Sequence, residues 1–255
     1  HEVEIQQRPV PVPDPDQVLV KIESVGVCGS DVHYYQHGRI GDFIVKEPMI
    51  LGHEACGTIV AVGEQVDSSR VGQRVSIEPQ RSCRVCEYCK RGEYNLCPHI
   101  EFYATPPIDG CFSEYALIQD DFAYEIPEQV SWDAGALLEP LSVGIAAARK
   151  AHLTVGDTVL VAGAGPIGAI VAQVAKAFGA REVVVTDMVA GRRETVLELG
   201  ATEAYAPGAP ELEGRTFDAF FDATGVTAAV VDGIKHVKAG GSAIIIGMGD
   251  DDMLL

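Results

Sequence analysis

The chain has 255 residues, of which 47% are hydrophobic and only 22% are charged, and this balance excludes an intrinsically disordered protein. The length predicts one large domain or two ordinary ones. The formal net charge of −18 disfavours binding to the phosphates of nucleic acids or to an anionic membrane surface, so we expect neither as a partner.

The first part of the chain, from residue 10 to about 75, has the pattern of a β-rich domain. Short β-branched runs at 18–22, 57–63 and 72–75 are separated by Gly, Pro and Asp. Short strands with turn residues between them predict a barrel or a sandwich. A further strand at 113–118 is expected to return to the same domain.

Two glycine-flanked segments of this domain, 26–33 and 52–54, carry potential metal ligands. Cys28, His53 and Glu54 offer a thiolate, an imidazole and a carboxylate, and three such ligands with room for a fourth are typical of a catalytic zinc site. The alternative is that Cys28 and His53 are ordinary core residues. Further polar side chains in the same two segments favour the metal site; they are Ser30, Asp31 and His33.

Four closely spaced cysteines form a second potential metal site: Cys83, Cys86, Cys89 and Cys97. The spacing C-x2-C-x2-C-x7-C lets four thiolates converge on one tetrahedral zinc, and with no open position this zinc would be structural. An iron–sulfur cluster is the alternative. The chain has seven cysteines, an odd number, so we expect metal binding in a reducing cytoplasm rather than a disulfide framework. The start of the chain also lacks the pattern of a secretory signal.

A helical pattern at 132–151, interrupted at Pro140, predicts the connection between two domains, which we place at 1–141 and 142–255. Beyond it, strands and helices alternate, which predicts a parallel, doubly wound sheet. The expected strands are 158–162, 182–187, 201–205, 219–222 and 242–247, and the expected helices are 166–178, 191–199 and 226–238. The connection between 205 and 217 is too short for a full helix.

A glycine-rich turn follows the first of these strands and matches G-x-G-x-x-G; it consists of Gly163, Ala164, Gly165, Pro166, Ile167 and Gly168. The first glycine permits the turn, the second lets a pyrophosphate approach, and the third packs helix on strand. Asp187, at the end of the next strand, is placed to accept hydrogen bonds from the adenosine ribose of NAD and to repel the 2′-phosphate of NADP. Arg192 and Arg193 soften this preference if they point toward the ribose; for Arg193 the alternative is a position on the helix surface.

In this order, these motifs and the segment 139–144 resemble the zinc-dependent medium-chain dehydrogenases. The segments 33–34, 38–41 and 104–107, with Phe102, resemble more narrowly the polyol branch, the sorbitol and xylitol dehydrogenases. The resemblance covers nearly the whole chain. It implies an α/β protein with a GroES-like β-rich catalytic domain followed by a Rossmann domain.

The resemblance also implies roles for single residues. Cys28, His53 and Glu54 would hold the catalytic zinc, and Glu139 would join these ligands or hold the water molecule of the zinc. Asp31 would orient the histidine ligand. The remaining roles are a proton relay through Ser30 and His33, substrate contacts by Tyr34, Phe102 and Glu139, and NAD contacts by Ile167, Asp187 and Arg192. For Tyr34 and Phe102, ordinary packing is the alternative.

The function implied is the interconversion of a polyol and a ketose with NAD, with one catalytic and one structural zinc. The alternatives are a dehydrogenase for threonine or a simple secondary alcohol, and a non-catalytic NAD-binding module held together by zinc. The chain begins at His1 without a Met, and relatives of this family extend past residue 255, so we expect the chain to be truncated at both ends and to lack part of the substrate pocket. A full-length form is expected to be a homodimer or homotetramer.

Overall fold

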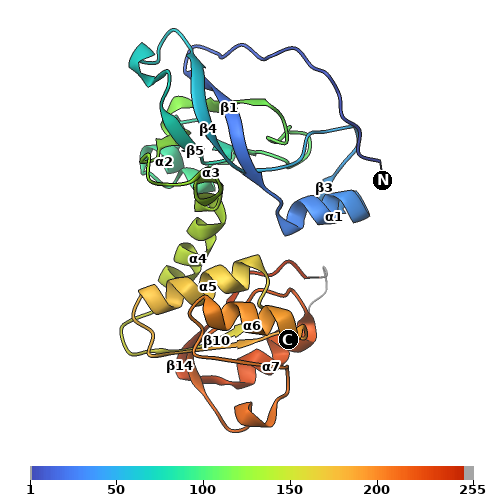
Figure 1. Cartoon of the computed structure of the whole chain (residues 1–255), viewed down its shortest axis with the longest axis vertical. Coiled ribbons are helices and arrows are strands. Elements are labelled where there is room, and N and C mark those ends of the chain that lie inside the picture. The colour runs from blue at the N-terminus through green and yellow to red at the C-terminus, as the bar shows by residue number, and fades with distance from the viewer. Residues whose placement is uncertain (1, 250–255) are drawn as a thin grey trace. The chain divides into compact units, whose positions relative to one another are not determined.

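The computed structural model describes residues 2–249, which form two compact units divided between Glu139 and Pro140 (Figure 1). The first unit is built on an antiparallel sheet of five strands in the order β8-β1-β4-β5-β9. These strands are β1 (Gln17–Gly26), β4 (Glu54–Val62), β5 (Arg74–Ile77), β8 (Tyr115–Gln119) and β9 (Ala123–Glu125). The predicted β-rich domain is thus confirmed, and each of its four predicted strands overlaps one of these.

Alternation along these strands places one set of apolar side chains in a common core. From β1, Val18 and Val20 are fully buried, and they meet Ile59 of β4 and Val75 of β5. Such burial stabilises the folded state by about 25 cal/mol per Å² of apolar surface. This core therefore stabilises the sheet to which the loops and α1 are attached. Two small two-stranded sheets lie outside it: β2 (Arg39–Ile40) with β3 (Phe43–Ile44), and β6 (Gln80–Arg81) with β7 (Glu101–Phe102).

The first unit also contains a helix that the β-rich pattern did not predict, α1 (Gly29–His37). It begins because Asp31 Oδ2 accepts a hydrogen bond from the backbone N–H of Cys28 at 2.9 Å, which satisfies a donor at the helix start. It ends at Gly38, whose φ of 70° is the left-handed conformation that glycine adopts without strain. The capping residue Asp31 and the terminating Gly38 both indicate a helix, but the β-branched segments around them led to the prediction of a purely β-rich domain.

Two helices follow the sheet. α3 (Trp132–Ala136) is capped by the Ser131 hydroxyl, which accepts a hydrogen bond from the Ala134 N–H, and α4 (Leu138–Lys150) begins after a break at Leu137. The helical pattern predicted at 132–151 with an interruption at Pro140 is thus two helices, but the break falls at Leu137. Pro140 lies in the first turn of α4, where its missing N–H costs no hydrogen bond.

The second unit is a parallel sheet of five strands in the order β12-β11-β10-β13-β14. The strands are β10 (Thr158–Ala162), β11 (Glu182–Thr186), β12 (Glu203–Tyr205), β13 (Phe217–Asp222) and β14 (Val237–Ile245). The helices between them are α5 (Pro166–Ala177), α6 (Ala190–Glu198) and α7 (Thr227–Lys235). Between β12 and β13 there is only a 3₁₀ turn (Pro210–Leu212), as the short connection required.

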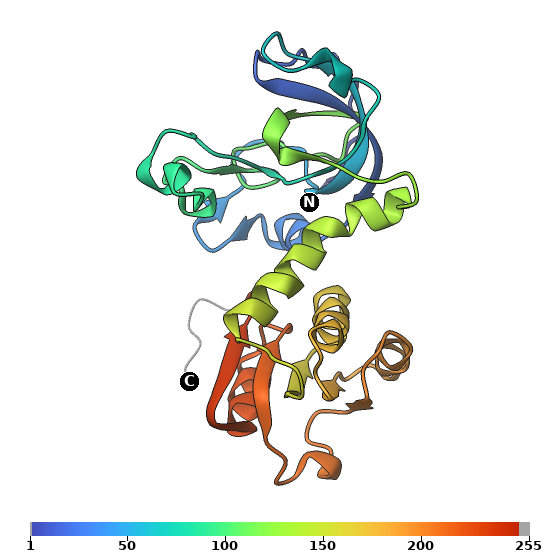
Figure 2. The ribbon, with the colours of Figure 1, turned by 90° about the vertical axis from the view of Figure 1, so that its left-hand side faces the viewer.

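Both faces of this sheet are covered, which confirms the doubly wound prediction. Val159 and Val161 of β10 belong to a cluster with residues of α4, α5 and α6, whereas Leu160 and Ala162 belong to a second cluster with Leu212 and Ala229. Consecutive residues of a strand point to opposite faces, so a buried run on β10 needs cover on both. In Figure 2, α5 and α6 lie together on one side of the strands.

The end of the second unit differs from the prediction in its bounds. The helix expected at 226–238 ends at Lys235, and β14 already begins at Val237, because Val237 pairs with Phe217 of β13. Among the described strands, β14 lies at one edge of the sheet. None of the helices within residues 2–249 combines the length and the apolar content that a membrane crossing requires.

Candidate metal and cofactor sites

Three side chains predicted as zinc ligands converge at the start of α1 and of β4. One donor atom from each of Cys28, His53 and Glu54 lies within 4.8 Å of the others. His53 and Glu54 are buried, and Cys28 is half-buried at the N-cap of α1. Gly26 of β1 faces Glu54 so closely that any side chain there would overlap its carboxylate.

Asp31 joins the two segments that carry these ligands. Its Oδ2 accepts a hydrogen bond from the Cys28 N–H, and its Oδ1 accepts one from the Gly52 N–H at 2.8 Å. Its Oδ1 also lies 4.0 Å from Nδ1 of His53, a buried ring nitrogen without a hydrogen-bond partner among the described residues. A carboxylate beside one nitrogen of a histidine leaves the other nitrogen for a metal, and Cys, His and Glu are all zinc ligands. These residues therefore fit a zinc ion.

The surroundings of the ligands keep them in a low-dielectric environment. Burial raises the pKa of the Cys28 thiol, although the hydroxyl and N–H of Ser30 both lower it by hydrogen bonding. Burial also raises the pKa of Glu54, which the charge of His53 lowers in part. A bound metal ion would lower both pKa values because it stabilises the ionised thiolate and carboxylate.

Glu139, at the start of α4, is electrostatically coupled to this group of ligands. Its pKa is raised to about 7, first by burial and then by the charges of Glu54 and Glu78, while His53 opposes the shift. Within the described residues, the three-ligand group does not include Glu139. Sequence reasoning missed Glu78, which accepts hydrogen bonds from Tyr94 Oη at 3.2 Å and Tyr124 Oη at 2.9 Å. The only feature of the sequence that could have identified Glu78 is its position directly after the apolar strand β5.

The residues predicted to contact substrate lie beside the ligands. The ring of Phe102 packs against that of His53, with centroids 5.6 Å apart. Tyr34 is buried, and burial raises the pKa of its hydroxyl while Thr105 lowers it in part. Ser30 and His33 are on the same helix, half-buried and exposed respectively.

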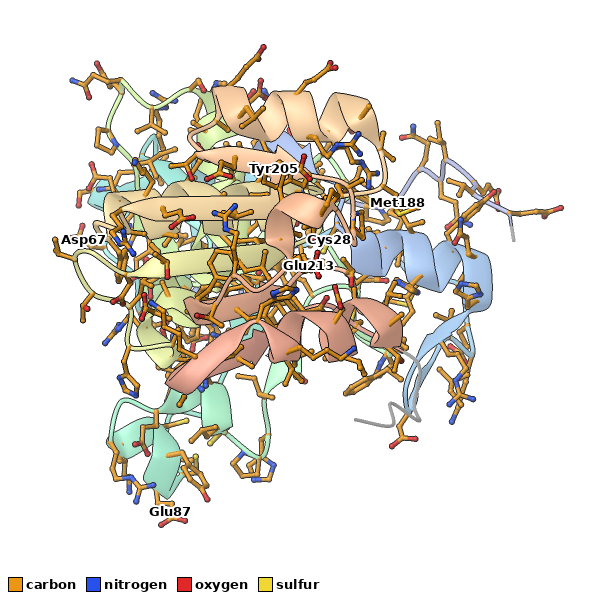
Figure 3. All side chains as sticks on the ribbon, turned by 90° about the horizontal axis from the view of Figure 1, so that it is seen from below. Cys28, Asp67, Glu87, Met188, Tyr205 and Glu213 are labelled. Atoms are coloured by element: carbon orange, nitrogen blue, oxygen red, sulfur yellow. The ribbon has the colours of Figure 1, made fainter. Side chains whose placement is uncertain are left out.

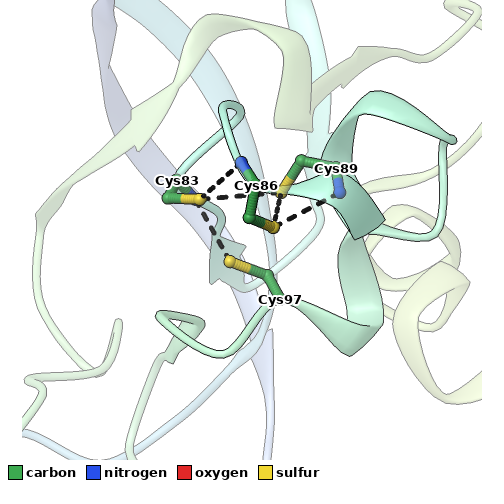
Figure 4. Close-up of side chains that lie close together, drawn as sticks. All are labelled: Cys83, Cys86, Cys89 and Cys97. Atoms are coloured by element: carbon green, nitrogen blue, oxygen red, sulfur yellow. Dashed lines mark hydrogen bonds between the residues drawn. The ribbon is translucent and has the colours of Figure 1, made fainter.

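The four-cysteine group is assembled as the spacing predicted (Figure 4). Donor sulfurs of Cys83, Cys86, Cys89 and Cys97 all lie within 4.8 Å of one another. The backbone N–H groups of Val85 and Cys86 lower the pKa of Cys83 to about 6, which favours the thiolate that binds zinc. All seven cysteines are free, and no open position remains among the four, so the group fits a structural zinc.

The glycine-rich turn has the geometry of a dinucleotide site. Gly163 has φ of 94°, and a side chain at Gly168 would overlap the Gly163 carbonyl, whereas the space beside Gly165 is open. Asp187 is buried, and its Oδ2 accepts a hydrogen bond from the Ala164 N–H at 2.8 Å. Its neighbour Met188 is 80% exposed (Figure 3). Open space before a helix N-terminus, next to a buried carboxylate, fits the pyrophosphate and ribose of NAD.

Arg192, predicted from the sequence to contact NAD, lies at the surface beside Asp187. Arg192 is exposed, and its Nη1 lies 3.9 Å from Asp187 Oδ2. Arg193 instead donates a hydrogen bond to the carbonyl of Asp187 at 2.7 Å. The carboxylate of Asp187 therefore has an exposed positive charge nearby, which is the arrangement that would soften the discrimination against NADP.

Comparison with known proteins agrees with this geometry. Residues 14–128 match the model of the alcohol dehydrogenase GroES-like domain, and residues 166–254 match that of the zinc-binding dehydrogenases. The chain is 46% identical to sorbitol dehydrogenase of Mus musculus, over 97% of the chain and 72% of that protein. It is 43% identical to a probable D-xylulose reductase A of Emericella nidulans, over 99% of the chain and 74% of that protein.

A solved structure of a dehydrogenase has the same fold as this chain. The 2R,3R-butanediol dehydrogenase of Bacillus subtilis superimposes with a TM-score of 0.88 at 30% identity, over 100% of this chain and 76% of that one. Fold and site together define a zinc- and nucleotide-dependent oxidoreductase. The chain belongs to the zinc-dependent medium-chain dehydrogenase family, in its polyol branch, and zinc and NAD are the cofactors of this class.

Proposed function

We propose that the protein interconverts a polyol of the sorbitol or xylitol type and the corresponding ketose with NAD. The observation that carries the proposal is the buried group Cys28, His53 and Glu54, with Phe102 packed on the histidine. Relatives named sorbitol dehydrogenase and D-xylulose reductase support the substrate class. A small diol or another secondary alcohol is the second candidate, since a butanediol dehydrogenase has the same fold.

Each cofactor has a group of residues that would hold it. Cys28, His53 and Glu54 would hold the catalytic zinc, the turn from Gly163 to Gly168 would hold the pyrophosphate of NAD, and Asp187 would bind its adenosine ribose. When bound, zinc supplies a Lewis acid that makes an alcohol hydroxyl more acidic, and NAD supplies the acceptor for a hydride.

The chain's own residues would then position the alcohol and carry away its proton. Ser30 Oγ would accept the hydroxyl proton while donating its own proton onward toward His33, and His33, one turn along α1 and exposed, would pass a proton to water. Phe102 excludes water from one side of His53. Glu139, partly buried near the charges of Glu54 and His53, hydrogen-bonds a substrate hydroxyl.

The test is a substrate panel with matched variants. NAD reduction is measured with sorbitol, xylitol, threonine and 2-butanol, and we expect the two polyols to give the highest kcat/KM. Ser30→Ala should lower kcat by about 10²-fold or more with zinc content unchanged, because only the proton path is cut. Glu139→Ala should raise KM for polyols as well. Full turnover in Ser30→Ala would refute the proton relay through Ser30. NAD binding by the parent without turnover of any alcohol would favour a non-catalytic NAD-binding module.

Three further assignments belong to the same proposal. Residues 1–141 form the catalytic domain and 142–255 the NAD-binding domain, close to the division between the compact units. The full-length protein is a homo-oligomer, a dimer or a tetramer. Free cysteines throughout the chain support a cytoplasmic location.

A further inference from the structure

Helix α1 carries a pair of histidines that the proposed reaction does not explain. His33 and His37 are four residues apart, so their side chains project from the same face of the helix. Their ring centroids are 5.6 Å apart, and the ring planes are inclined by 45°. Both residues are exposed, whereas Tyr34, which lies between them in the sequence, is buried.

No other group within residues 2–249 competes for these rings. Neither imidazole takes part in a hydrogen bond or ion pair with another described side chain, so the contact between the two rings is their only described interaction. The pair is also separate from the candidate zinc ligands, since the three-ligand group at Cys28 includes neither histidine. The ring nitrogens are therefore available to a ligand from solvent.

Two imidazoles at this spacing have a specific chemistry. Histidines at i and i+4 on one helix face bind a single transition-metal ion, as they do in helical zinc sites. Imidazole suits Zn²⁺, Ni²⁺ and Cu²⁺, whereas Mg²⁺ and Ca²⁺ prefer oxygen ligands. His37 is in the last turn of α1, where the helix dipole favours a cation.

We propose that His33 and His37 form a second, weaker site for a divalent transition-metal ion, and that its occupation inhibits the enzyme. The ion is bound by one nitrogen of each ring, and water completes its coordination. A histidine whose nitrogen is held by a metal cannot accept a proton there, so His33 is withdrawn from the relay. The inhibition rests on the proposed role of His33, whereas the binding site does not.

Binding is tested first, without reference to activity. The zinc-loaded protein is freed of excess metal and titrated with Ni²⁺ by calorimetry, and Cu²⁺ is added for electron paramagnetic resonance. We expect one additional Ni²⁺ site per chain, a Cu²⁺ spectrum with nitrogen coupling, and no response to Mg²⁺. His37→Gln should weaken the site by at least about 10-fold, because one of two protein ligands is lost.

The matched control is His152→Asn, which removes an exposed histidine far from α1 in sequence. His152 has φ of 54°, a conformation that asparagine tolerates. The control should bind Ni²⁺ as the parent does. Equal affinity in His37→Gln and in the parent would mean an adventitious ion only, and it would overturn the site.

Inhibition is tested second, by the rate of NADH formation during the same Ni²⁺ titration. We expect the parent protein to lose activity at the Ni²⁺ concentration that fills the site. His37→Gln should keep the parent rate without Ni²⁺ and resist inhibition. If Ni²⁺ binds the parent and not His37→Gln, yet the rate is unchanged, the site stands and the relay through His33 is refuted.

Discussion

The carboxylate of Asp31 lies 4.0 Å from Nδ1 of His53 while it also accepts hydrogen bonds from the backbone of both ligand segments. One side chain, only 3% exposed, thus sets the position of the Cys28 loop, the Gly52 loop and the imidazole ring. A buried carboxylate costs free energy unless it is well hydrogen-bonded, and the two N–H donors meet that requirement.

Asp31→Asn should weaken zinc binding at Cys28, His53 and Glu54 by about 10- to 100-fold. The amide has the same shape, but its NH₂ would face a backbone N–H donor and it carries no charge to orient His53. The measurement is a chelator competition that reports zinc affinity. Asp133→Asn, at an exposed carboxylate that accepts a hydrogen bond from Ser24, is the control and should leave the affinity unchanged. Equal affinities in the two variants would contradict the role of Asp31.

Cys97→Ser should remove the structural zinc. The sulfur of Cys97 accepts hydrogen bonds from the N–H groups of Cys83 and His99, and serine can keep these contacts but cannot supply a thiolate. Metal analysis should show about one zinc fewer per chain, and limited proteolysis should cut the loop between residues 83 and 97 faster.

The control for that experiment is Cys56→Ser, because Cys56 donates to the Trp132 carbonyl at 2.8 Å and serine can do the same. Its zinc content should equal that of the parent. If Cys97→Ser also kept all its zinc, the four-cysteine assignment would be wrong.

Asp187→Ser should weaken NAD binding and narrow the preference for NAD over NADP. The structure adds a second reason for the loss, since the carboxylate also accepts hydrogen bonds from the N–H groups of Ala164 and Val189, both at 2.8 Å. We expect an increase in Kd for NAD of about 10-fold or more, measured by fluorescence titration with both nucleotides. Arg192→Ala is the companion variant and should sharpen the preference for NAD, because it removes the positive charge beside Asp187. A parent protein that binds NADP as tightly as NAD would refute the ribose contact.

The stability of the second unit should depend on pH through Asp218. Burial by itself raises the pKa of this carboxyl, but the Thr158 N–H and hydroxyl and the Lys238 ammonium lower it to about 2. The folded pKa is below the unfolded value of about 3.9, so the stabilisation is present above about pH 4 and is lost as the pH falls toward 2.

Asp218→Asn measures that contribution. The side chain is 35% exposed, so solvent screening limits the effect, and we expect a loss of about 1 kcal/mol in the free energy of unfolding at pH 7. In urea titrations the difference from the parent should shrink between about pH 5 and pH 2. Asp232→Asn, at an exposed position of α7, should show no such trend. A difference that stays constant down to the lowest pH would exclude the ion pair as its source.

Where the determinants are local, the sequence by itself was sufficient. Cysteine spacing predicted the four-thiolate group, the glycine turn predicted the cofactor site, and the period of apolar residues predicted the strands β10 to β13 with few errors in their bounds. Each of these depends on residues close together in the chain, whose relative positions are restricted by backbone geometry alone. The exception is α1, whose capping residues Cys28 and Asp31 were present but were outweighed by the strands around them.

Other features depend on residues that are far apart in the chain, and only the tertiary structure decided them. The hydrogen bond between Asp31 and Gly52, the packing of Phe102 on His53, and the charge of Glu78 near Glu139 all join separate elements. Such contacts depend on strand register and on how loops and helices pack over the sheet, which residues close together in the chain do not determine. The sequence therefore determined which chemical groups are present, and the packed sheet determined which of them act together.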